Sequence, residues 1–153
     1  MVWVGKMESQ EKRERRNMSK RDHVFSLPVR VYFQDTDAGG VVYHASYVNF
    51  MERARTEWLR THGYSNAGLM KEFGVVFVVR SLRLDYFKPA LLDDLLEVTA
   101  QIKEIGRSRL NLLQSVQRGG EVLAGGEVHL VCVSVEGFKP VSVPEVLRKR
   151  LKV

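Results

Sequence analysis

A short segment of the chain holds several residues that could carry out chemistry. Asp35 and Asp37 are two residues apart, Gly39 and Gly40 follow, and His44 comes soon afterwards. If the chain is extended as far as Asp37, both carboxylates point to the same face, because side chains alternate along a strand. The glycines would permit a ligand to approach the backbone closely. A carboxylate in this setting can act as a general base or a nucleophile.

The residues after the glycines have the pattern of a helix that would position this chemistry. Apolar side chains recur at helical spacing from Tyr47 to Trp58, so we expect a helix from near His44 to near His62. A helix N-terminus offers free N–H groups and about half a positive charge, which can stabilise a developing oxyanion. Carboxylate, glycine turn and helix end are together the parts for acyl-group hydrolysis. The alternative is that Asp35 and Asp37 only cap a turn, and their spacing alone favours neither.

Metal chemistry is a weaker interpretation of the same residues. The Asp-x-Asp pattern resembles the start of a calcium loop, but Gly39 has no side chain where the next oxygen ligand would stand. The histidines, at positions 23, 44, 62 and 129, do not have zinc-ligand spacing. The only cysteine, Cys132, lies in an apolar run and is expected to be a buried, inert thiol. We therefore expect no metal site.

The remaining elements are predicted to be strands. A first strand is expected over 29–33, a small helix or turn over 66–72, and four long strands follow with alternating side chains: 75–87, 96–102, 108–117 and 121–135. Gly119-Gly120 predicts a hairpin, and Gly125-Gly126 a bulge or sharp bend. Long antiparallel strands usually curl, and the helix offers an apolar stripe for their concave face. The predicted fold class is α+β, with a curled antiparallel sheet wrapped around one helix.

Length and charge limit the other possibilities. The chain has 153 residues and a net charge of +6, and no apolar run approaches the roughly 20 residues of a membrane span. Residues 1–22 hold seven basic and four acidic side chains, so half of the excess charge lies there. We interpret 1–22 as a charged, mobile tail without the features of a secretory signal, and 23–153 as one domain. Because no aromatic residue is interleaved with these charges, we expect no nucleic-acid partner.

The segment that carries the chemistry also resembles a known family. The motif DTDAGGVVYHASY, followed by FMERARTEWL, closely resembles the Tol–Pal-associated acyl-CoA thioesterases, in the 4-hydroxybenzoyl-CoA thioesterase-like branch of the hot-dog fold. The resemblance covers about residues 27–142, through FVVR (77–80), LDDL (92–95) and LVCV (130–133) to KP (139–140). It implies a curled sheet around one helix, in agreement with the pattern above.

The resemblance also implies roles for individual residues. The catalytic carboxylate of the family falls on Asp37, as nucleophile or general base, and the helix-terminal position that polarises the thioester carbonyl falls on His44. Several relatives have a tyrosine four residues before the catalytic aspartate, where this chain has Phe33, so that hydroxyl is absent or replaced by Tyr32. Another hot-dog branch places its catalytic acid on the helix, which keeps Glu52 as an alternative.

Substrate-binding candidates come from the same motif and from basic residues elsewhere. Gly39, Gly40, Val41, Tyr43 and Tyr47 are expected near the acyl group, although core packing is the alternative for Tyr47. Coenzyme A carries phosphates, for which Arg80, Arg107 and Ser108 are the candidates, each with a solvated charge or surface residue as its alternative.

The predicted function is a hydrolase of acyl-CoA or acyl-carrier-protein thioesters. Coenzyme A would be part of the substrate, and no metal or redox cofactor is needed. The resemblance implies a homodimer, often assembled to a tetramer, with active sites at the subunit interface. We also expect a cytoplasmic location, with which the lone cysteine is compatible. The alternative is a non-catalytic scaffold that meets proteins of the cell envelope or of lipid synthesis.

Overall fold

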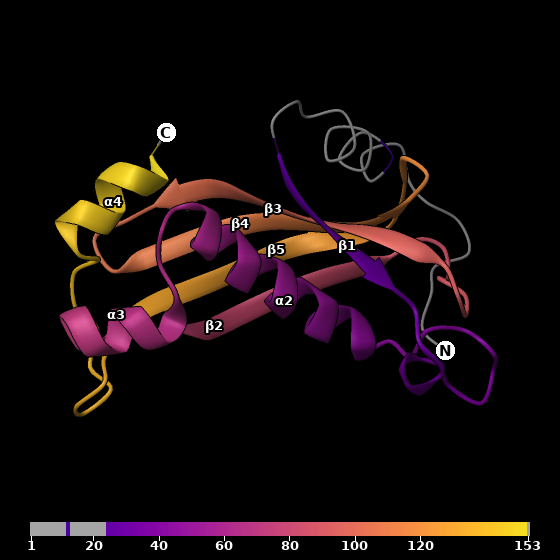
Figure 1. Ribbon diagram of the computed structural model, residues 1–153, viewed down its shortest axis with the longest axis horizontal. Coiled ribbons are helices and arrows are strands. Elements are labelled where there is room, and N and C mark those ends of the chain that lie inside the picture. Colours follow the sequence, from indigo (N-terminus) through magenta and orange to yellow (C-terminus); the bar gives the residue numbers. More distant parts are fainter. Residues whose placement is uncertain (1–11, 13–23, 153) are drawn as a thin grey trace.

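The computed structural model describes Lys12 and residues 24–152 (Figure 1). The predicted tail therefore lies outside the described residues except for Lys12, as does His23, and the predicted domain boundary stays a prediction. The described fold runs in the order β1 (Phe25–Arg30), η1 (Phe33–Asp35), α2 (Ser46–Thr61), α3 (Asn66–Phe73), β2 (Val75–Tyr86), β3 (Leu95–Ile105), β4 (Arg109–Arg118), β5 (Glu121–Ser134) and α4 (Glu145–Leu151).

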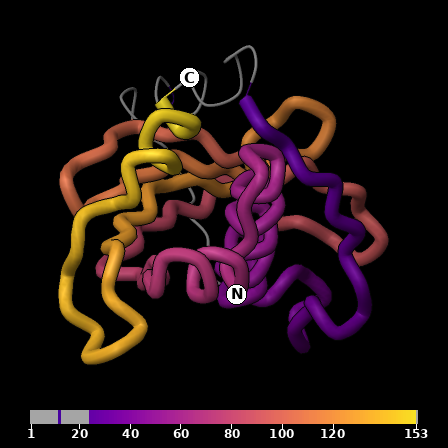
Figure 2. The backbone as a smooth tube through the Cα atoms, turned by 60° about the vertical axis from the view of Figure 1, so that its left-hand side comes forward, coloured from indigo at the N-terminus to yellow at the C-terminus, as the bar shows by residue number. Residues whose placement is uncertain are grey.

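The five strands form one antiparallel sheet in the order β1-β3-β4-β5-β2. Figures 1 and 2 show the sheet curling around α2, which packs on β1, β3 and β4. The short helices α3 and α4 both lie at the end of the sheet away from the start of α2 (Figure 1). The predicted α+β architecture is confirmed.

Helix α2 has the predicted apolar face and nearly the predicted bounds. Its stripe is buried against the sheet: Tyr47, Phe50, Met51, Ala54 and Trp58. Full burial of a large apolar side chain contributes about 1.5–3 kcal/mol, so this face holds the helix in place. The helix ends at Thr61, and Gly63, which follows the C-cap residue His62, has a positive φ of 88°, the left-handed conformation in which glycine commonly ends a helix.

The hairpin between β4 and β5 is also confirmed. Arg118 pairs with Glu121, which leaves Gly119 and Gly120 as a two-residue loop. Both have positive φ, 57° and 81°, as a type I′ turn requires. Glycine adopts this conformation at no steric cost, which explains both residues.

The first strand differs from the prediction. It begins at Phe25 and ends at Arg30, instead of running from Val29 to Phe33. Pro28 is tolerated because β1 is an edge strand, so its missing N–H breaks no bond in the sheet. The strand ends early because the chain turns into η1, where the Asp35 carboxylate accepts a hydrogen bond from the Tyr32 N–H at 2.8 Å.

The bulge predicted at Gly125-Gly126 is not found at those residues. Both residues pair in continuous register with β2 and β4, and the irregularity in β5 falls at Leu123 instead. A Cβ on Gly126 would collide with the backbone carbonyl of Arg83, so this glycine allows β2 and β5 to approach closely. Two further bulges leave Arg80 unpaired in β2 and Lys103 unpaired in β3.

Candidate functional site

The turn that precedes α2 holds Asp37. The Asp37 N–H donates to the Val41 carbonyl at 2.8 Å, and the Gly40 N–H donates to the Asp37 carbonyl at 3.0 Å. The Asp37 carboxylate accepts from the Gly39 N–H at 2.8 Å. Gly40 has φ of +79°, and a Cβ on Gly39 would lie 3.0 Å from Asp37 Oδ1. Both glycines are therefore needed for the turn that holds this carboxylate.

Asp35 has a different place from Asp37, which corrects the expectation that both carboxylates share a strand face. The chain is not extended here but forms η1, and Asp35 is buried with 9% of its surface exposed. Its carbonyl accepts from the Tyr43 N–H at 2.8 Å and from the Ser46 hydroxyl at 3.2 Å. Asp35 therefore fastens the turn to the start of α2, whereas Asp37 is only partly buried.

The start of α2 lies two residues after His44. The helix begins at Ser46, and its N-cap residue, Ala45, has no side chain that could accept a hydrogen bond. The first turn also contains no acidic residue, so the positive end of the helix is not neutralised by its own side chains. The His44 ring lies 4.5 Å from that of Tyr43, and the His44 carbonyl accepts from the Tyr86 hydroxyl at 2.6 Å.

Tyr47 and Tyr86 pack together beneath this segment. Their rings meet edge to face with centroids 5.2 Å apart, and only 2% of Tyr47 is exposed. Burial raises the pKa of the Tyr47 phenol, and the negative charge of Asp37 contributes to the same rise. Burial likewise raises the pKa of Tyr86. Tyr47 therefore packs in the core, which was the alternative to a place in the acyl pocket.

The loop between β2 and β3 completes the surroundings, and sequence reasoning missed it. The Val42 N–H donates to the Ala90 carbonyl at 2.9 Å, and the Ala90 N–H donates to the Tyr47 hydroxyl at 3.0 Å. Val41, which is buried, forms a bridge with Leu91. These contacts join segments more than forty residues apart, and no local pattern marks Tyr86 or Ala90 as their partners.

Not all predicted binding residues lie together within one chain. Gly39, Gly40, Val41, Tyr43 and His44 surround the Asp37 turn, and Tyr43 is about half exposed. Arg107 donates from Nε to the Ser142 hydroxyl at 2.9 Å, and the backbone carbonyl of its neighbour Ser108 accepts from the Cys132 N–H at 2.7 Å. Figure 1 shows this end of the sheet, beside α4, opposite the start of α2. Arg80 is exposed at its bulge in the middle of β2.

The alternative catalytic groups have surroundings of their own. Glu52 is exposed on α2 and lines a cavity between α2 and β2, away from the residues of the Asp37 turn. Cys132 is buried, and burial raises the pKa of its thiol to about 11. A thiol with that pKa is protonated at neutral pH, which fits the expected inert role.

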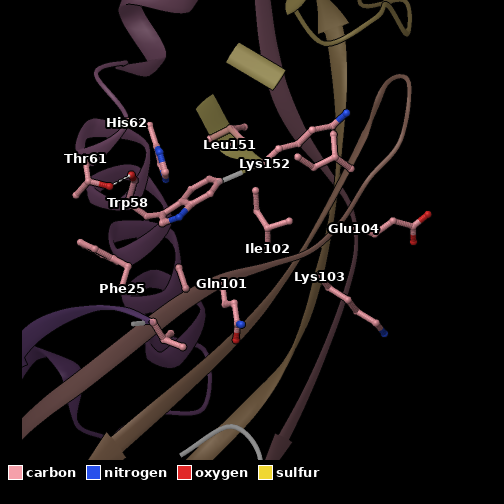
Figure 3. A pocket seen from close by; sticks show the side chains of 13 residues that line it. Phe25, Trp58, Thr61, His62, Gln101, Ile102, Lys103, Glu104, Leu151 and Lys152 are labelled. Carbon is pink, nitrogen blue, oxygen red and sulfur yellow. Dashed lines mark hydrogen bonds between the residues drawn. The ribbon is translucent and has the colours of Figure 1, made fainter. Parts of the chain in front are cut away.

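Two cavities lie along α2. One of about 570 Å³ lies at its C-terminal end, where Figure 3 shows Trp58 and His62 side by side, with Ile102 and Leu151 near them. A second of about 320 Å³ lies between α2 and β2 and is lined by Arg55, Thr56, Phe77, Leu110 and Leu130, among others. Neither is lined by Asp37 or His44.

Within Lys12 and residues 24–152, no group of three or more His, Cys, Asp or Glu side chains could hold a metal ion. No helix described there is long and apolar enough to cross a membrane.

The curled antiparallel sheet wrapped around one central helix is the architecture of the hot-dog fold. Residues 31–151 match the model of the Thioesterase-like superfamily, and the chain belongs to that family. Its hot-dog fold and its class of enzyme, a thioesterase, are thereby confirmed.

Relatives with curated names agree. The chain is 45% identical over 124 residues to the acyl-CoA thioesterase YbgC of Haemophilus influenzae, covering 81% of this chain and 91% of that one. It is 48% identical over 123 residues to the acyl-CoA thioester hydrolase YbgC of Escherichia coli O157:H7, covering 80% and 91%. Among solved structures, a probable thioesterase from Bartonella henselae matches with a TM-score of 0.76 at 34% identity, covering 79% of this chain and 99% of that one.

Proposed function

We propose that this protein hydrolyses acyl-CoA thioesters at the turn before α2. The observation that carries the proposal is the Asp37 carboxylate, held by a glycine turn directly before a helix N-terminus that has no side-chain cap. The names of the relatives, acyl-CoA thioesterase and acyl-CoA thioester hydrolase, support the substrate class.

The chemistry follows from these two groups. Asp37 would either remove a proton from water or attack the thioester carbonyl itself, and in each case an electron pair forms a new C–O bond. The negative charge that develops on the carbonyl oxygen faces the positive end of α2 and the backbone beside His44. The C–S bond then breaks. If Asp37 acts as a base, the proton that it took from water passes to the sulfur, and coenzyme A leaves as the thiol. If Asp37 acts as the nucleophile, coenzyme A leaves as the thiolate, which takes a proton from solvent, and water then hydrolyses the acyl-Asp37 anhydride and restores the carboxylate.

The wider setting of this reaction is also proposed. An acyl-carrier-protein thioester would suit the same chemistry, and no metal or redox cofactor is needed for it. The resemblance of the DTDAGG segment supports a homodimer or tetramer, a cytoplasmic location and association with Tol–Pal proteins of the envelope. These stay predictions.

The test is the substitution Asp37→Asn. We expect turnover to fall by about 10²-fold or more, the usual lower reach for loss of a general base, without loss of the folded state. The measurement is release of free thiol from acyl-CoA, with circular dichroism as the folding check. Asp35→Asn is the matched control and should have the smaller effect. Unchanged turnover in Asp37→Asn would contradict the mechanism, and a larger effect in Asp35→Asn would show that the wrong carboxylate was chosen.

A panel of thioesters identifies the substrate. Short aliphatic, long aliphatic and aromatic acyl-CoA would be compared with acyl-carrier protein by the same thiol assay. Hydrolysis of none of them by the folded protein would favour the scaffold alternative over the enzyme.

A further inference from the structure

Two backbone N–H groups directly before α2 have no hydrogen-bond acceptor in the described part of the chain. They belong to His44 and Ala45, the residues that precede the first residue of the helix. The next N–H along, that of Ser46, donates to the Tyr43 carbonyl at 2.9 Å. Ala45 is exposed, so a substrate can reach it. The segment therefore offers two adjacent donors to a negatively charged oxygen.

Each of these N–H groups shares a peptide unit with a carbonyl that already accepts a hydrogen bond. The Tyr43 carbonyl, in the unit of the His44 N–H, accepts from Ser46. The His44 carbonyl, in the unit of the Ala45 N–H, accepts from the Tyr86 hydroxyl at 2.6 Å. No peptide bond in the described chain is cis, and in a trans unit the C=O and N–H point in opposite directions. The Ala45 N–H therefore points away from Tyr86.

The Tyr86 hydroxyl is held in place from two sides. Tyr86 is the last residue of β2, and its backbone pairs with Ala124 in β5. Its ring meets the ring of Tyr47 edge to face, with an angle of 85° between the ring planes. Tyr47 is fixed in turn, because its hydroxyl accepts the Ala90 N–H. The sheet and the buried ring pair together determine where the Tyr86 hydroxyl donates.

This hydroxyl is a permanent donor at neutral pH. Burial raises the pKa of Tyr86 above its ordinary value of 10.0, so the phenol keeps its proton. Hydrogen bonds in a chain polarise one another, by about 10–30% per bond in a medium of low dielectric constant. The bond from Tyr86 to the His44 carbonyl therefore orients this peptide unit and makes the Ala45 N–H a stronger donor.

We propose that the Ala45 N–H stabilises the oxyanion of the thioester, and that Tyr86 is the positioning residue for this N–H. The inference rests on the proposed hydrolysis. When the new C–O bond forms, an electron pair of the thioester C=O moves to the oxygen, and it returns when the C–S bond breaks. Tyr86 keeps its proton throughout. Because the full charge exists only between these two steps, the donor acts mainly on the transition state.

The substitution Tyr86→Phe tests the positioning role, because it removes the hydroxyl and keeps the ring against Tyr47. We expect kcat for acyl-CoA to fall about 10-fold, less than the roughly 10²–10³-fold for loss of a direct oxyanion donor, since the N–H itself remains. KM should stay within about twofold, as for an interaction made only in the transition state. Tyr64→Phe is the control, since its ring lies against Phe73 beyond the other end of α2.

Binding of intact acyl-CoA separates positioning from a general loss of structure. Asp37→Asn, which should leave the substrate uncleaved, is compared with the double variant Asp37→Asn, Tyr86→Phe by titration calorimetry. We expect the same Kd within about twofold, because the ground-state site is intact. An unchanged kcat in Tyr86→Phe would overturn the proposal. So would a fall in kcat that is matched by an equal weakening of binding.

The substitution Ala45→Pro removes the donor itself. Ala45 has φ of −74°, which proline can adopt, and its N–H has no partner within residues 24–152 that would be lost. Ala45→Gly is the matched variant, because it keeps the N–H. We expect kcat of Ala45→Pro to lie about 10²-fold below that of Ala45→Gly. Equal kcat in the two variants, both folded by circular dichroism, would overturn the role of the Ala45 N–H.

Infrared difference spectroscopy tests the same hydrogen bond without turnover. Acyl-CoA labelled with ¹³C at the thioester carbonyl is bound to Asp37→Asn, with and without Tyr86→Phe. Donation by an N–H lowers the stretching frequency of the carbonyl, and we expect the double variant to return part of this lowering. An identical frequency in both would overturn the role of Tyr86 even where Asp37→Asn abolishes turnover. Absence of thiol release by the folded wild-type protein would instead contradict the proposed function.

Discussion

The Asp35 carboxylate accepts a hydrogen bond from the Tyr32 N–H. The backbone carbonyl of Asp35 accepts two more, from the Tyr43 N–H and the Ser46 hydroxyl. All of these bonds hold backbone in the turn before α2. The Asp37 carboxylate accepts the Gly39 N–H at 2.8 Å and stays partly exposed, in the loop that precedes α2. Burial and hydrogen bonding thus assign structural support to one carboxylate and leave the other accessible to a substrate.

Asp35→Ala should therefore act on stability more than on catalysis. The Tyr32 N–H would lose its acceptor in a part-buried place, which costs about 1 kcal/mol, the lower end of the range for a buried donor. We expect the free energy of unfolding in urea to fall by that amount. At a temperature where the variant is folded, its thiol-release rate should fall less than that of Asp37→Asn. An equal loss of rate with unchanged stability would contradict this division.

The motif on one continuous segment made most of this site predictable, since Asp37, Gly39, Gly40 and His44 are neighbours in sequence. The partners of the segment could not be predicted. Tyr86 reaches His44 from the end of β2, and Ala90 reaches Tyr47 from a loop, so both contacts depend on tertiary packing. The different surroundings of Asp35 depended on η1, which no strand pattern indicates.

Among the elements, α2 is joined to the sheet by a polar contact as well as by its apolar face. Gln114 in β4 is 1% exposed, and its amide donates to the Met51 carbonyl at 3.0 Å and to the Thr99 carbonyl at 3.1 Å. Its oxygen accepts from Arg55 at 3.0 Å. Burial lowers the pKa of Arg55, against the opposing effect of the Glu52 charge. The Gln114 side chain therefore joins α2, β3 and the half-buried guanidinium of Arg55.

Gln114→Leu should destabilise the protein by about 2–4 kcal/mol, because two carbonyls and a guanidinium lose a partner in a buried place. Urea denaturation measures this loss. Adding Arg55→Met should recover part of it, because the cation that lost its acceptor is then absent. A double variant whose loss equals the sum of the two single losses would show that Arg55 and Gln114 do not act together.

Gly126→Ala tests the close approach of β2 and β5. The added methyl would meet the Arg83 carbonyl, so one strand must move. We expect a loss of about 2 kcal/mol or more in the free energy of unfolding, within the range of overpacking. Gly119→Ala is the control, since its Cβ would meet nothing within 4 Å and only its positive φ adds a cost. A larger loss in the control would contradict the packing argument.

The alternation of side chains predicted β2 to β5 to within a few residues, because each strand buries one face on the core. Bulges were harder to predict. Those at Arg80, Lys103 and Leu123 follow from the curvature of the whole sheet and not from a residue that marks them. Gly126 was misinterpreted for a related reason. A glycine is needed there because β2 lies close to it, and not because β5 bends at that residue.

At the scale of the whole molecule, the charge divides between the described fold and residues 1–22. That segment holds half of the net charge of +6, and the family match begins only at residue 31. Deleting residues 1–22 should leave acyl-CoA hydrolysis within about twofold of the full chain, since the residues argued for catalysis all follow it. Retention on heparin should fall at the same time, because seven basic side chains are removed. Loss of hydrolysis in a folded, dimeric deletion variant would contradict this separation.

The pairing of β1 with β3 has a consequence for synthesis on the ribosome. Phe25 pairs with Ala100, so the first strand to be made cannot enter the sheet until β3 has followed it. Helix α2 is also made before β3 and β4, two of the three strands that it packs on. The β4–β5 hairpin, which needs only a two-residue loop, can form locally at the end. The nascent chain therefore exposes the apolar stripe of α2 until β3 and β4 have followed, and we expect it to depend on chaperones that bind unfolded chains during that interval.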